Sequence, residues 1–217
     1  MTRDILLTEL YLAQRSRWPA RGRCILAQFD DESAVVYQAY RKDIGEFAIE
    51  HQYFGGAFSL GRMSWIKPNF LWMMYRSGWG TKAEQEVVLA VRLRRAAFDQ
   101  ILADAVFSSF QPGLYGDREA WQHEVASSDV RLQWDPDHAP GGAKEERRAI
   151  QLGLRGEMLR RYAREWILEI IDLRDFVAEQ RGNIATLPAL ITPREQVYAI
   201  GDTNTARRLG LDIQPDA

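Results

Sequence analysis

The stretch from Gly61 to Ala83 combines cationic and aromatic side chains and contains no acidic residue. Its four basic residues and three of the chain's seven tryptophans are Arg62, Lys67, Arg76, Lys82, Trp65, Trp72 and Trp79. Cations can meet phosphate oxygens while flat rings stack on bases, each stacked base contributing about 1–3 kcal/mol. The pattern favours a ligand with phosphates and flat bases. We therefore expect Arg62, Lys67 and Arg76 to share one phosphate-binding cleft.

The same stretch is also consistent with an ordinary core helix. Pro68 suits the first helical turn and Gly78 suits the position just past the end, so a helix is predicted at 68–77. Its apolar residues would pack in the core, and its N-terminal N–H groups would add to an anion site. We expect both roles to be present, with Ser64, Trp65 and Trp72 joining the cations at the ligand.

A second candidate is the string Val36-Tyr37-Gln38-Ala39-Tyr40-Arg41. Side chains alternate along a strand, so Gln38 and Tyr40 share one face and can address one ligand, with Arg41 beside them. The alternative is a half-buried strand with a capping arginine. The sequence leaves both interpretations open.

A third candidate is Gln133-Trp134-Asp135-Pro136-Asp137-His138. Two acids and a histidine within four residues are metal-ligand types, but their spacing matches no established set, so no metal site is predicted. Asp-Pro-Asp is also ordinary turn chemistry. A general acid–base role for Asp135 or His138 remains open.

A fourth candidate is the basic segment Arg147–Gly156. On a helix, Arg148, Gln151 and Arg155 would lie along one side, and we expect that side to line the cleft opposite Arg62. Gly153 and Gly156 suggest close approach of another helix or of a ligand. The alternative is a solvated face with local ion pairs.

The elements that must position these residues follow from periodicity and turn signals. Strands are predicted at 23–29, 34–41, 86–93 and 130–134, with a turn at 30–33. Helices are predicted at 4–14 (a helix or arm), 42–52, 68–77, 95–107, 144–180 (two helices) and 194–200. The expected fold is α+β, with a small mixed or antiparallel sheet and about six helices. Residues 1–217 are expected to form a single globular domain, with a loop-rich tail at 188–217.

Composition narrows the function classes. The chain has 217 residues, a net charge of −2 and 46% hydrophobic residues, so a nucleic-acid site must rest on a local patch. Its one cysteine, Cys24, lies in an apolar run and is predicted to be a buried, inert thiol in a reducing compartment. No apolar run reaches the ~20 residues of a membrane helix, so a cytoplasmic protein with no membrane partner is expected.

Four strings together resemble a bacterial and fungal family of domains of unknown function. They are "YQAYR", "SWIKPNFLWMMYRSGW", "QWDPDH" and "RRAIQLGLRG", and the resemblance covers nearly the whole chain. Asn69 stands where the family pattern has Ser. More distantly, the family is similar to ADP-ribosyltransferase-like folds, whose split sheets hold NAD.

That resemblance implies roles for particular residues. Gln38 or Tyr40 would supply the polar residue of an early strand, Ser64, Trp65 or Tyr75 the hydroxyl or aromatic group, and Glu86 the later glutamate. In the functional hypothesis below, Gln38 and Tyr40 orient the ribose or nicotinamide, and Glu86 or Asp135 polarises the acceptor. The leading hypothesis is an ADP-ribosyltransferase-like enzyme that uses NAD and modifies a nucleic acid or nucleotide. One alternative is a non-catalytic RNA- or nucleotide-binding module that uses the same Arg- and Trp-rich cleft, and another is a structural interaction protein.

Overall fold

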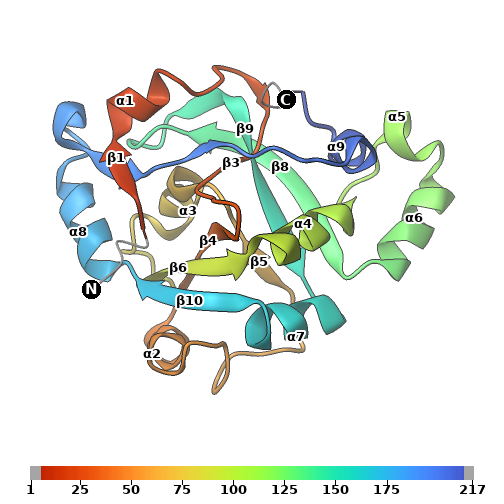
Figure 1. The fold of residues 1–217 in the computed structure, drawn as a ribbon, viewed down its shortest axis with the longest axis horizontal. Helices are drawn as coiled ribbons and strands as arrows, with labels where there is room; N and C mark the ends of the chain where they lie inside the picture. The colour runs from red at the N-terminus through yellow and green to blue at the C-terminus, as the bar shows by residue number, and fades with distance from the viewer. Residues whose placement is uncertain (1–5, 213–217) are drawn as a thin grey trace.

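Two β-sheets enclose an apolar core in the computed structural model, which describes residues 6–212 (Figure 1). Helices surround the sheets, so the α+β class predicted from the sequence is confirmed. The core between the sheets includes Val36 and Leu89 from one sheet and Leu132 and Leu152 from the other. Removal of such side chains from water is the main favourable term in folding.

The first sheet is antiparallel, with the strand order β10–β6–β4. Its strands are β4 Ser33–Tyr40, β6 Val87–Arg94 and β10 Ile167–Asp172. The strands predicted at 34–41 and 86–93 are confirmed to within one residue. Their β-branched and aromatic residues suit a sheet that is packed on both faces.

The second sheet has the order β2–β9–β8–β7. β2 pairs with β9 at Arg147 and Arg148, and β5 pairs with the later part of β9, at 152–154. Its strands are β2 Gly22–Arg23, β5 Ser64–Ile66, β7 Ala105–Phe107, β8 Val130–His138 and β9 Lys144–Leu154. β8 and β9 form a long antiparallel hairpin. The strand predicted at 130–134 is therefore correct but too short, because pairing with β9 carries it on to His138.

The prediction of helices throughout 144–180 is wrong in its first part. Residues 144–154 form β9, and helix α7 Gly156–Arg164, strand β10 and helix α8 Arg174–Gly182 follow. Glu and Arg favour helices, but an intrinsic preference is worth less than about 1 kcal/mol per residue. Pairing with β8 buries alternate residues of β9 in the core, including Leu152 and Leu154, and decides the outcome.

A backbone bridge joins the two sheets between β4 and β5. Tyr37 donates its N–H to the Lys67 carbonyl at 2.7 Å, and Lys67 donates back to the Tyr37 carbonyl at 3.3 Å. Beyond this bridge β4 stays with β6 while β5 stays with β9, so the two strands diverge. The opening between Tyr40 and Ser64 is called the split below.

Helix α3, Phe70–Ser77, follows β5 and brings part of the candidate stretch over the sheets. The Asn69 side chain accepts a hydrogen bond from the Trp72 N–H at 2.7 Å, and Gly78 ends the helix with φ +57. The helix predicted at 68–77 is confirmed but starts two residues later, because Asn69 is its N-cap. Phe70 and Met74 are buried in a second apolar cluster that includes Tyr37.

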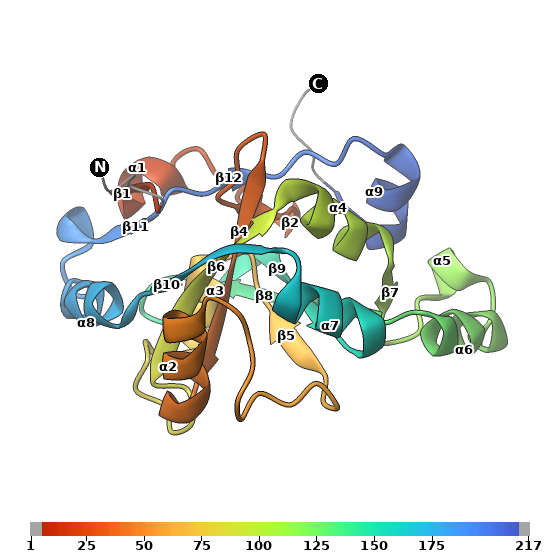
Figure 2. The same ribbon diagram turned by 60° about the horizontal axis from the view of Figure 1, so that its bottom comes forward.

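Two further predicted helices are present. Helix α2, Lys42–His51, confirms the prediction at 42–52. Helix α4, Arg95–Ala103, is shorter than the predicted 95–107, because residues 105–107 join the second sheet as β7. Figures 1 and 2 place two unpredicted helices, α5 Pro112–Tyr115 and α6 Arg118–Ser127, at the end of the molecule opposite α8.

The early and late parts of the described chain pair with each other. β1 Thr8–Leu10 pairs with β11 Ile191–Pro193, and β3 Leu26–Ala27 pairs with β12 Gln196–Val197. The remaining elements are α1 Tyr11–Arg15, the 3₁₀ turn η1 Leu187–Ala189 and α9 Thr203–Leu209.

Four predictions fall in these terminal segments. The helix predicted at 194–200 is wrong, because β12 occupies that position. The helix or arm predicted at 4–14 is a strand and a short helix, with residues 4 and 5 outside the described residues. Only the short strands β2 and β3 form within 23–29. The turn at 30–33 is confirmed by a 2.9 Å hydrogen bond from the Asp30 N–H to the Ser33 carbonyl.

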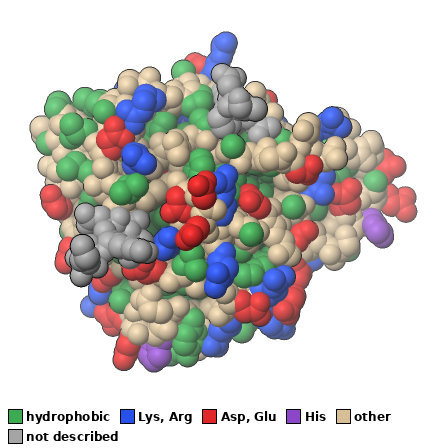
Figure 3. Space-filling model, viewed as in Figure 1, with side chains coloured by type: hydrophobic (Ala, Val, Ile, Leu, Met, Phe, Trp, Pro, Cys, Tyr) green, Lys and Arg blue, Asp and Glu red, His purple; other side chains and the backbone are tan. Residues whose placement is uncertain are grey.

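The surface viewed in Figure 3 intersperses acidic and basic side chains over the whole face. This face therefore offers no broad basic area of the kind that duplex nucleic acid requires. Within residues 6–212, no helix has the length and apolar character needed to cross a membrane.

Candidate functional site

Gln38 holds the split together from inside the core. Its Nε2 donates to the Tyr40 hydroxyl at 2.7 Å, to the Ser64 hydroxyl at 2.9 Å and to the Trp65 carbonyl at 3.3 Å. Its Oε1 accepts from the Tyr162 hydroxyl at 2.5 Å. Gln38 is 2% exposed, so both ends of its amide are engaged within the protein. The Gln38 amide, which the sequence predicted to orient a ligand, here bonds to Tyr40, Ser64 and Tyr162 and so positions Tyr40 and Ser64.

Tyr40 and Ser64 face each other across the split, with 2.7 Å between their hydroxyl oxygens. Burial raises the pKa of Tyr40 far above its usual value, against the lowering effect of its hydrogen bonds to Ser64 and Gln38. The phenol therefore stays protonated at physiological pH. It can offer a neutral hydroxyl to a ligand, but not a phenolate base.

A pocket of about 420 Å³ opens beside this pair of hydroxyls. The side chains that line it include Tyr40, Arg41, Phe58, Arg62, Ser64 and Glu84. Its size lies within the usual range for small-molecule sites, about 300–1,000 Å³. This pocket, called the split pocket below, collects four residues that the sequence marked as candidates: Tyr40, Arg41, Arg62 and Ser64.

The two arginines of the split pocket differ in their partners. Arg41 lies 2.6 Å from the Asp43 carboxylate and 3.7 Å from that of Glu84. Arg62 is exposed and makes no ion pair within residues 6–212. Arg62 is thus the cation available to an incoming anion.

The carboxylate at the split pocket belongs to Glu84 rather than to the predicted Glu86. Glu84 lines the pocket and has φ +68, in the left-handed region that a non-glycine residue seldom adopts. Glu86 is exposed and accepts a hydrogen bond from the Glu84 N–H at 3.1 Å. Strained backbone of this kind occurs often at functional sites. The loop before β6 therefore presents Glu84 at the site.

A second polar cluster lies on the opposite side of β5, on the outer face of the second sheet. Alternation along the strands places Trp65, Lys67, Gln133, Asp135 and Gln151 on this face. The Asp135 carboxylate accepts from Gln133 Nε2 at 2.8 Å and from Gln151 Nε2 at 2.7 Å. These five residues are called the outer face below.

Lys67 is the unusual member of the outer face. It is 6% exposed, and within residues 6–212 its ammonium has no hydrogen bond and no ion pair. Burial, and then the Arg76 guanidinium, lower the pKa of Lys67 to about 8, while Asp135 acts in the opposite direction. Arg76 is near enough to Lys67 to influence its charge, whereas Arg62 lines the split pocket. The three cations therefore do not share one cleft as expected, and a phosphate-binding role for Lys67 and Arg76 stays a prediction.

Trp65 covers the backbone of β9 at Gly153. A Cβ added to Gly153 would lie 2.6 Å from Met63 Sδ and 3.0 Å from the Trp65 ring. The lack of a side chain at Gly153 therefore makes room for Met63 and Trp65. The sequence had suggested that another helix or a ligand would approach here.

Gly153→Ala is expected to lower the free energy of unfolding by about 1–3 kcal/mol, because the Met63 side chain and the Trp65 ring must both move to admit the methyl group. Urea unfolding followed by circular dichroism measures it. Gly182→Ala, at an α8 position with nothing within 4 Å, is the matched control and should be neutral or stabilising by up to about 1 kcal/mol. Equal stability of Gly153→Ala and wild type would contradict the close contact.

Trp72 is engaged in a cluster of parallel rings. Tyr75 stacks on His138 with 3.5 Å between ring centroids, and Trp72 lies 5.3 Å from His138 and 5.5 Å from Tyr75. Trp72 is 5% exposed and His138 is 2% exposed. Burial lowers the pKa of His138, with Asp137 opposing. The Trp72 ring, which the sequence predicted to stack on a base, is therefore packed against the rings of His138 and Tyr75. Tyr75 is 46% exposed rather than buried in the core, and it is the open ring of the cluster.

Behind these rings lies a buried group of ionisable side chains. Arg147 Nη2 lies 2.6 Å from the Asp137 carboxylate, and both side chains are almost fully buried. Glu195 is also buried and accepts from the Phe70 N–H at 2.6 Å and from Asn69 Nδ2 at 3.0 Å. The group therefore joins the hairpin β8–β9, the start of α3 and the late segment that carries Glu195.

Comparison with known families assigns the chain. The sequence profile of the family described as "Domain of unknown function (DUF4291)" matches residues 24–198. The chain belongs to this family. The matched region of the DUF4291 domain includes the split pocket, the outer face and Glu195. No curated protein matches the chain.

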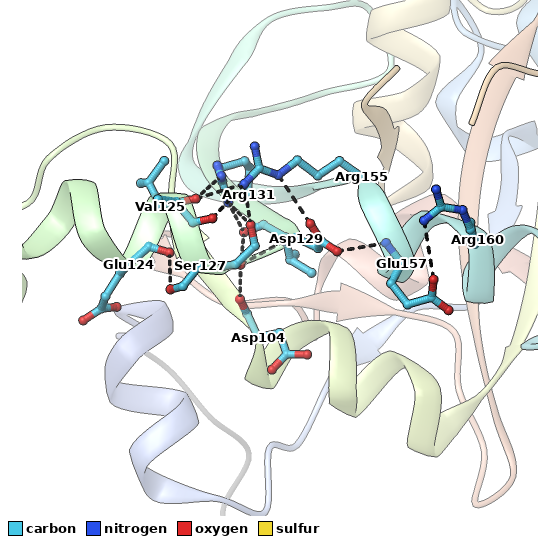
Figure 4. A network of polar contacts seen from close by, with 12 residues as sticks. Asp104, Glu124, Val125, Ser127, Asp129, Arg131, Arg155, Glu157 and Arg160 are labelled. Atoms are coloured by element: carbon cyan, nitrogen blue, oxygen red, sulfur yellow. Dashed lines mark hydrogen bonds and ion pairs between the residues drawn. The ribbon is translucent and has the colours of Figure 1, made fainter. Parts of the chain in front are cut away.

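Arg155 of the DUF4291 domain is committed to the end of helix α6. It donates to the carbonyls of Val125 and Ser128 at 3.1 and 2.9 Å and lies 3.5 Å from Asp129. Figure 4 shows Arg155 beside Val125, Asp129 and Arg131. Arg131 joins it at the same carbonyls. Arginines at a helix C-terminus satisfy its free carbonyl groups and its dipole. The prediction that Arg155 lines the cleft is therefore wrong.

The helical side predicted to unite Arg148, Gln151 and Arg155 does not exist in the DUF4291 domain, because β9 is a strand. Residues three apart on a strand point to opposite faces, so Arg148 and Gln151 separate. Gln151 reaches the outer face through Asp135, whereas Arg148 is exposed. Gly156 has φ +54, and a Cβ there would collide with the Asp129 carboxylate. The two glycines of this segment thus serve the fold.

The remaining features of the DUF4291 domain concern metals and the thiol. Within residues 6–212, no group of His, Cys, Asp and Glu side chains could hold a metal ion. Cys24 is buried, as predicted, and burial raises the pKa of its thiol to about 11.

Sequence reasoning missed Phe58 and Glu84 at the split pocket, because neither belongs to a recognisable motif.

Proposed function

We propose that this DUF4291 domain is an ADP-ribosyltransferase-like enzyme that binds NAD in the split pocket and modifies a nucleotide or nucleic acid. The supporting observation is that one pocket collects cations, aromatic rings, a hydroxyl and a carboxylate: Arg41, Arg62, Tyr40, Phe58, Ser64 and Glu84. These groups fit NAD, which carries a diphosphate, ribose hydroxyls and a flat nicotinamide ring.

Each group of the pocket has a role in this proposal. NAD supplies an ADP-ribosyl group: the bond between ribose C1′ and nicotinamide breaks, the acceptor bonds to C1′, and nicotinamide leaves as a neutral molecule. Arg62 and Arg41 hold the diphosphate. Tyr40 and Phe58 form the wall for the nicotinamide ring, and the Ser64 hydroxyl is a hydrogen-bond partner for its carboxamide.

Glu84 replaces Glu86 and Asp135 as the proposed acidic group. Its carboxylate takes the proton of the acceptor and stabilises the positive charge that develops on the ribose. One well-placed electrostatic group of this kind contributes about 3–4 kcal/mol to the transition state. Asp135 lies on the outer face, on the other side of β5, and Glu86 is exposed outside the lining of the pocket.

One observation favours a second candidate, a non-catalytic RNA- or nucleotide-binding module. The Gln38 amide, the polar group expected to orient the substrate, has protein partners at both ends. A binding module needs no such group and would keep Arg62 and the aromatic wall. The two candidates differ in whether NAD is consumed.

Glu84→Gln is expected to reduce nicotinamide release from NAD by about 100-fold or more, because the substitution keeps the shape of the side chain and removes its charge. The assay follows nicotinamide release with nucleotides, RNA and DNA as acceptors. Glu86→Gln is the matched control, two residues away and outside the lining of the split pocket, and should retain activity.

One further result would decide against the enzyme, and another against the role of Glu84. No release by the wild-type protein with any acceptor, together with nucleotide binding that survives Glu84→Gln and is lost in Arg62→Ala, would support the binding module. Equal losses in Glu84→Gln and Glu86→Gln would assign the effect to the loop as a whole rather than to the Glu84 carboxylate.

A further inference from the structure

The outer face contains a cation that the fold does not use. Lys67 is only 6% exposed, and within residues 6–212 its ammonium has neither a hydrogen bond nor an ion pair. A buried charge without a partner is costly, and proteins seldom keep one without a partner or a ligand. Met or Leu would fill the same position without that cost. The position therefore requires an explanation other than packing.

Arg76 adds a second unpaired cation beside Lys67. It is exposed on α3, forms no ion pair within residues 6–212, and is close enough to Lys67 to influence its charge. The Lys67 side chain is thus almost fully buried, and the Arg76 side chain is exposed at the protein surface. Such a pair suits a small anion that is partly enclosed.

Asp135 does not neutralise the pair. Its two carboxylate oxygens accept hydrogen bonds from Gln133 and Gln151, and it makes no ion pair with Lys67. Two cations and one carboxylate leave a net positive charge on this part of the outer face. The glutamines also fix the carboxylate, so it cannot turn freely toward Lys67.

We propose that Lys67 and Arg76 form a phosphate-binding subsite on the outer face, separate from the split pocket, that takes the phosphate of a nucleotide. Lys67 provides a point charge and Arg76 a planar pair of donors, a combination that suits a phosphomonoester. Trp65, two residues from Lys67 on the same face, stands beside the subsite as an aromatic surface for the base. The further suggestion that the acceptor nucleotide binds in this subsite rests on the proposed function. The suggestion that the subsite binds phosphate does not.

The test uses calorimetric titration of the full chain at constant ionic strength with three ligands: adenosine monophosphate, inorganic phosphate and adenosine. The wild-type protein should bind the monophosphate more tightly than adenosine. Lys67→Met and Arg76→Gln should each weaken its binding at least tenfold. Arg148→Gln removes an exposed arginine away from the outer face and should leave the affinity unchanged. Because Arg76 is exposed, its variant tests the subsite even if Lys67→Met perturbs the fold.

The comparison of ligands identifies the source of the phosphate. Stronger binding of the monophosphate than of inorganic phosphate supports a nucleotide, whereas equal affinities would show a site for free phosphate and overturn the nucleotide assignment. Unchanged binding in both Lys67→Met and Arg76→Gln would overturn the subsite itself.

Arg62→Ala separates this inference from the proposed function. It should weaken NAD binding and leave the affinity for the monophosphate unchanged. Loss of monophosphate binding in Arg62→Ala alone would place the phosphate in the split pocket and overturn the subsite. Absence of nicotinamide release by the wild type, with monophosphate binding that depends on Lys67, would reject the enzyme and keep the subsite.

Discussion

Lys67→Met is expected to raise the free energy of unfolding at pH 7 by about 3 kcal/mol. The pKa of Lys67 falls from 10.5 to about 8 on folding, chiefly through burial and secondarily through Arg76, with Asp135 opposing. Each pKa unit corresponds to about 1.4 kcal/mol, so the charged amine disfavours the folded state by that amount. Methionine has a similar length and no charge to desolvate.

The pH dependence follows from the direction of this shift. Between pH 8 and 10.5 the unfolded state binds more protons at Lys67 than the folded state. The stability contributed by this group therefore rises with pH across that window. The advantage of Lys67→Met over wild type should be full below pH 8 and small near pH 10.5.

Urea unfolding of the two proteins at pH 7, 8, 9 and 10 measures this difference, and other titrating groups cancel in the comparison. Lys82→Met, at an exposed position, is the control and should change stability little at any pH. A variant less stable than wild type at pH 7 would mean that the ammonium makes a favourable interaction in the fold. That result would remove the physical reason for assigning Lys67 to a ligand.

Arg147→Met is expected to lower the free energy of unfolding by about 3–5 kcal/mol. Arg147 Nη2 lies 2.6 Å from the Asp137 carboxylate, with side-chain exposures of 7% and 1%. Removal of one partner leaves the other charge buried without compensation. The variant also loses the 2.6 Å hydrogen bond from Arg147 Nη1 to the Pro19 carbonyl.

Thermal and urea unfolding at neutral pH test this prediction. Arg174→Met is the matched control, because it removes an arginine whose 2.6 Å pair with Asp172 is exposed to solvent. Screened pairs of that kind contribute less than about 1 kcal/mol. Similar losses in the two variants would show that burial does not set the importance of the Asp137–Arg147 pair.

The sequence already indicated that the cations of the stretch from Gly61 to Ala83 would lack acidic partners, because the stretch contains no Asp or Glu. No ion pair to Arg62, Lys67, Arg76 or Lys82 forms within residues 6–212, as their separation from Asp and Glu along the chain suggested. The sequence did not show which of these cations lie together in the fold. Lys67 directly follows β5 and Arg62 lies in the loop before it, and the strand separates the outer face from the split pocket. Neighbours in sequence therefore serve two different places.

Local signals were sufficient where an element is decided by its own residues. The β-branched run of β4 and the Gly78 that ends α3 gave those elements to within one or two residues. β9 shows the opposite case, because its Arg- and Glu-rich start favours a helix and its pairing with β8 lies outside the local sequence. Long-range pairing contributes more than intrinsic propensity, so the tertiary structure decided that segment.

The sequence by itself determined the α+β class and the paired strands β4 and β6. Only the tertiary structure decided which of the candidate side chains remain free of protein partners. In the folded protein Gln38 bonds to Tyr162 in the core, Arg155 bonds to the carbonyls at the end of α6, and Glu84 rather than Glu86 lines the split pocket. The physical reason is that a polar side chain bonds the nearest partner in space, and distance in space is set by the packing of segments far apart along the chain.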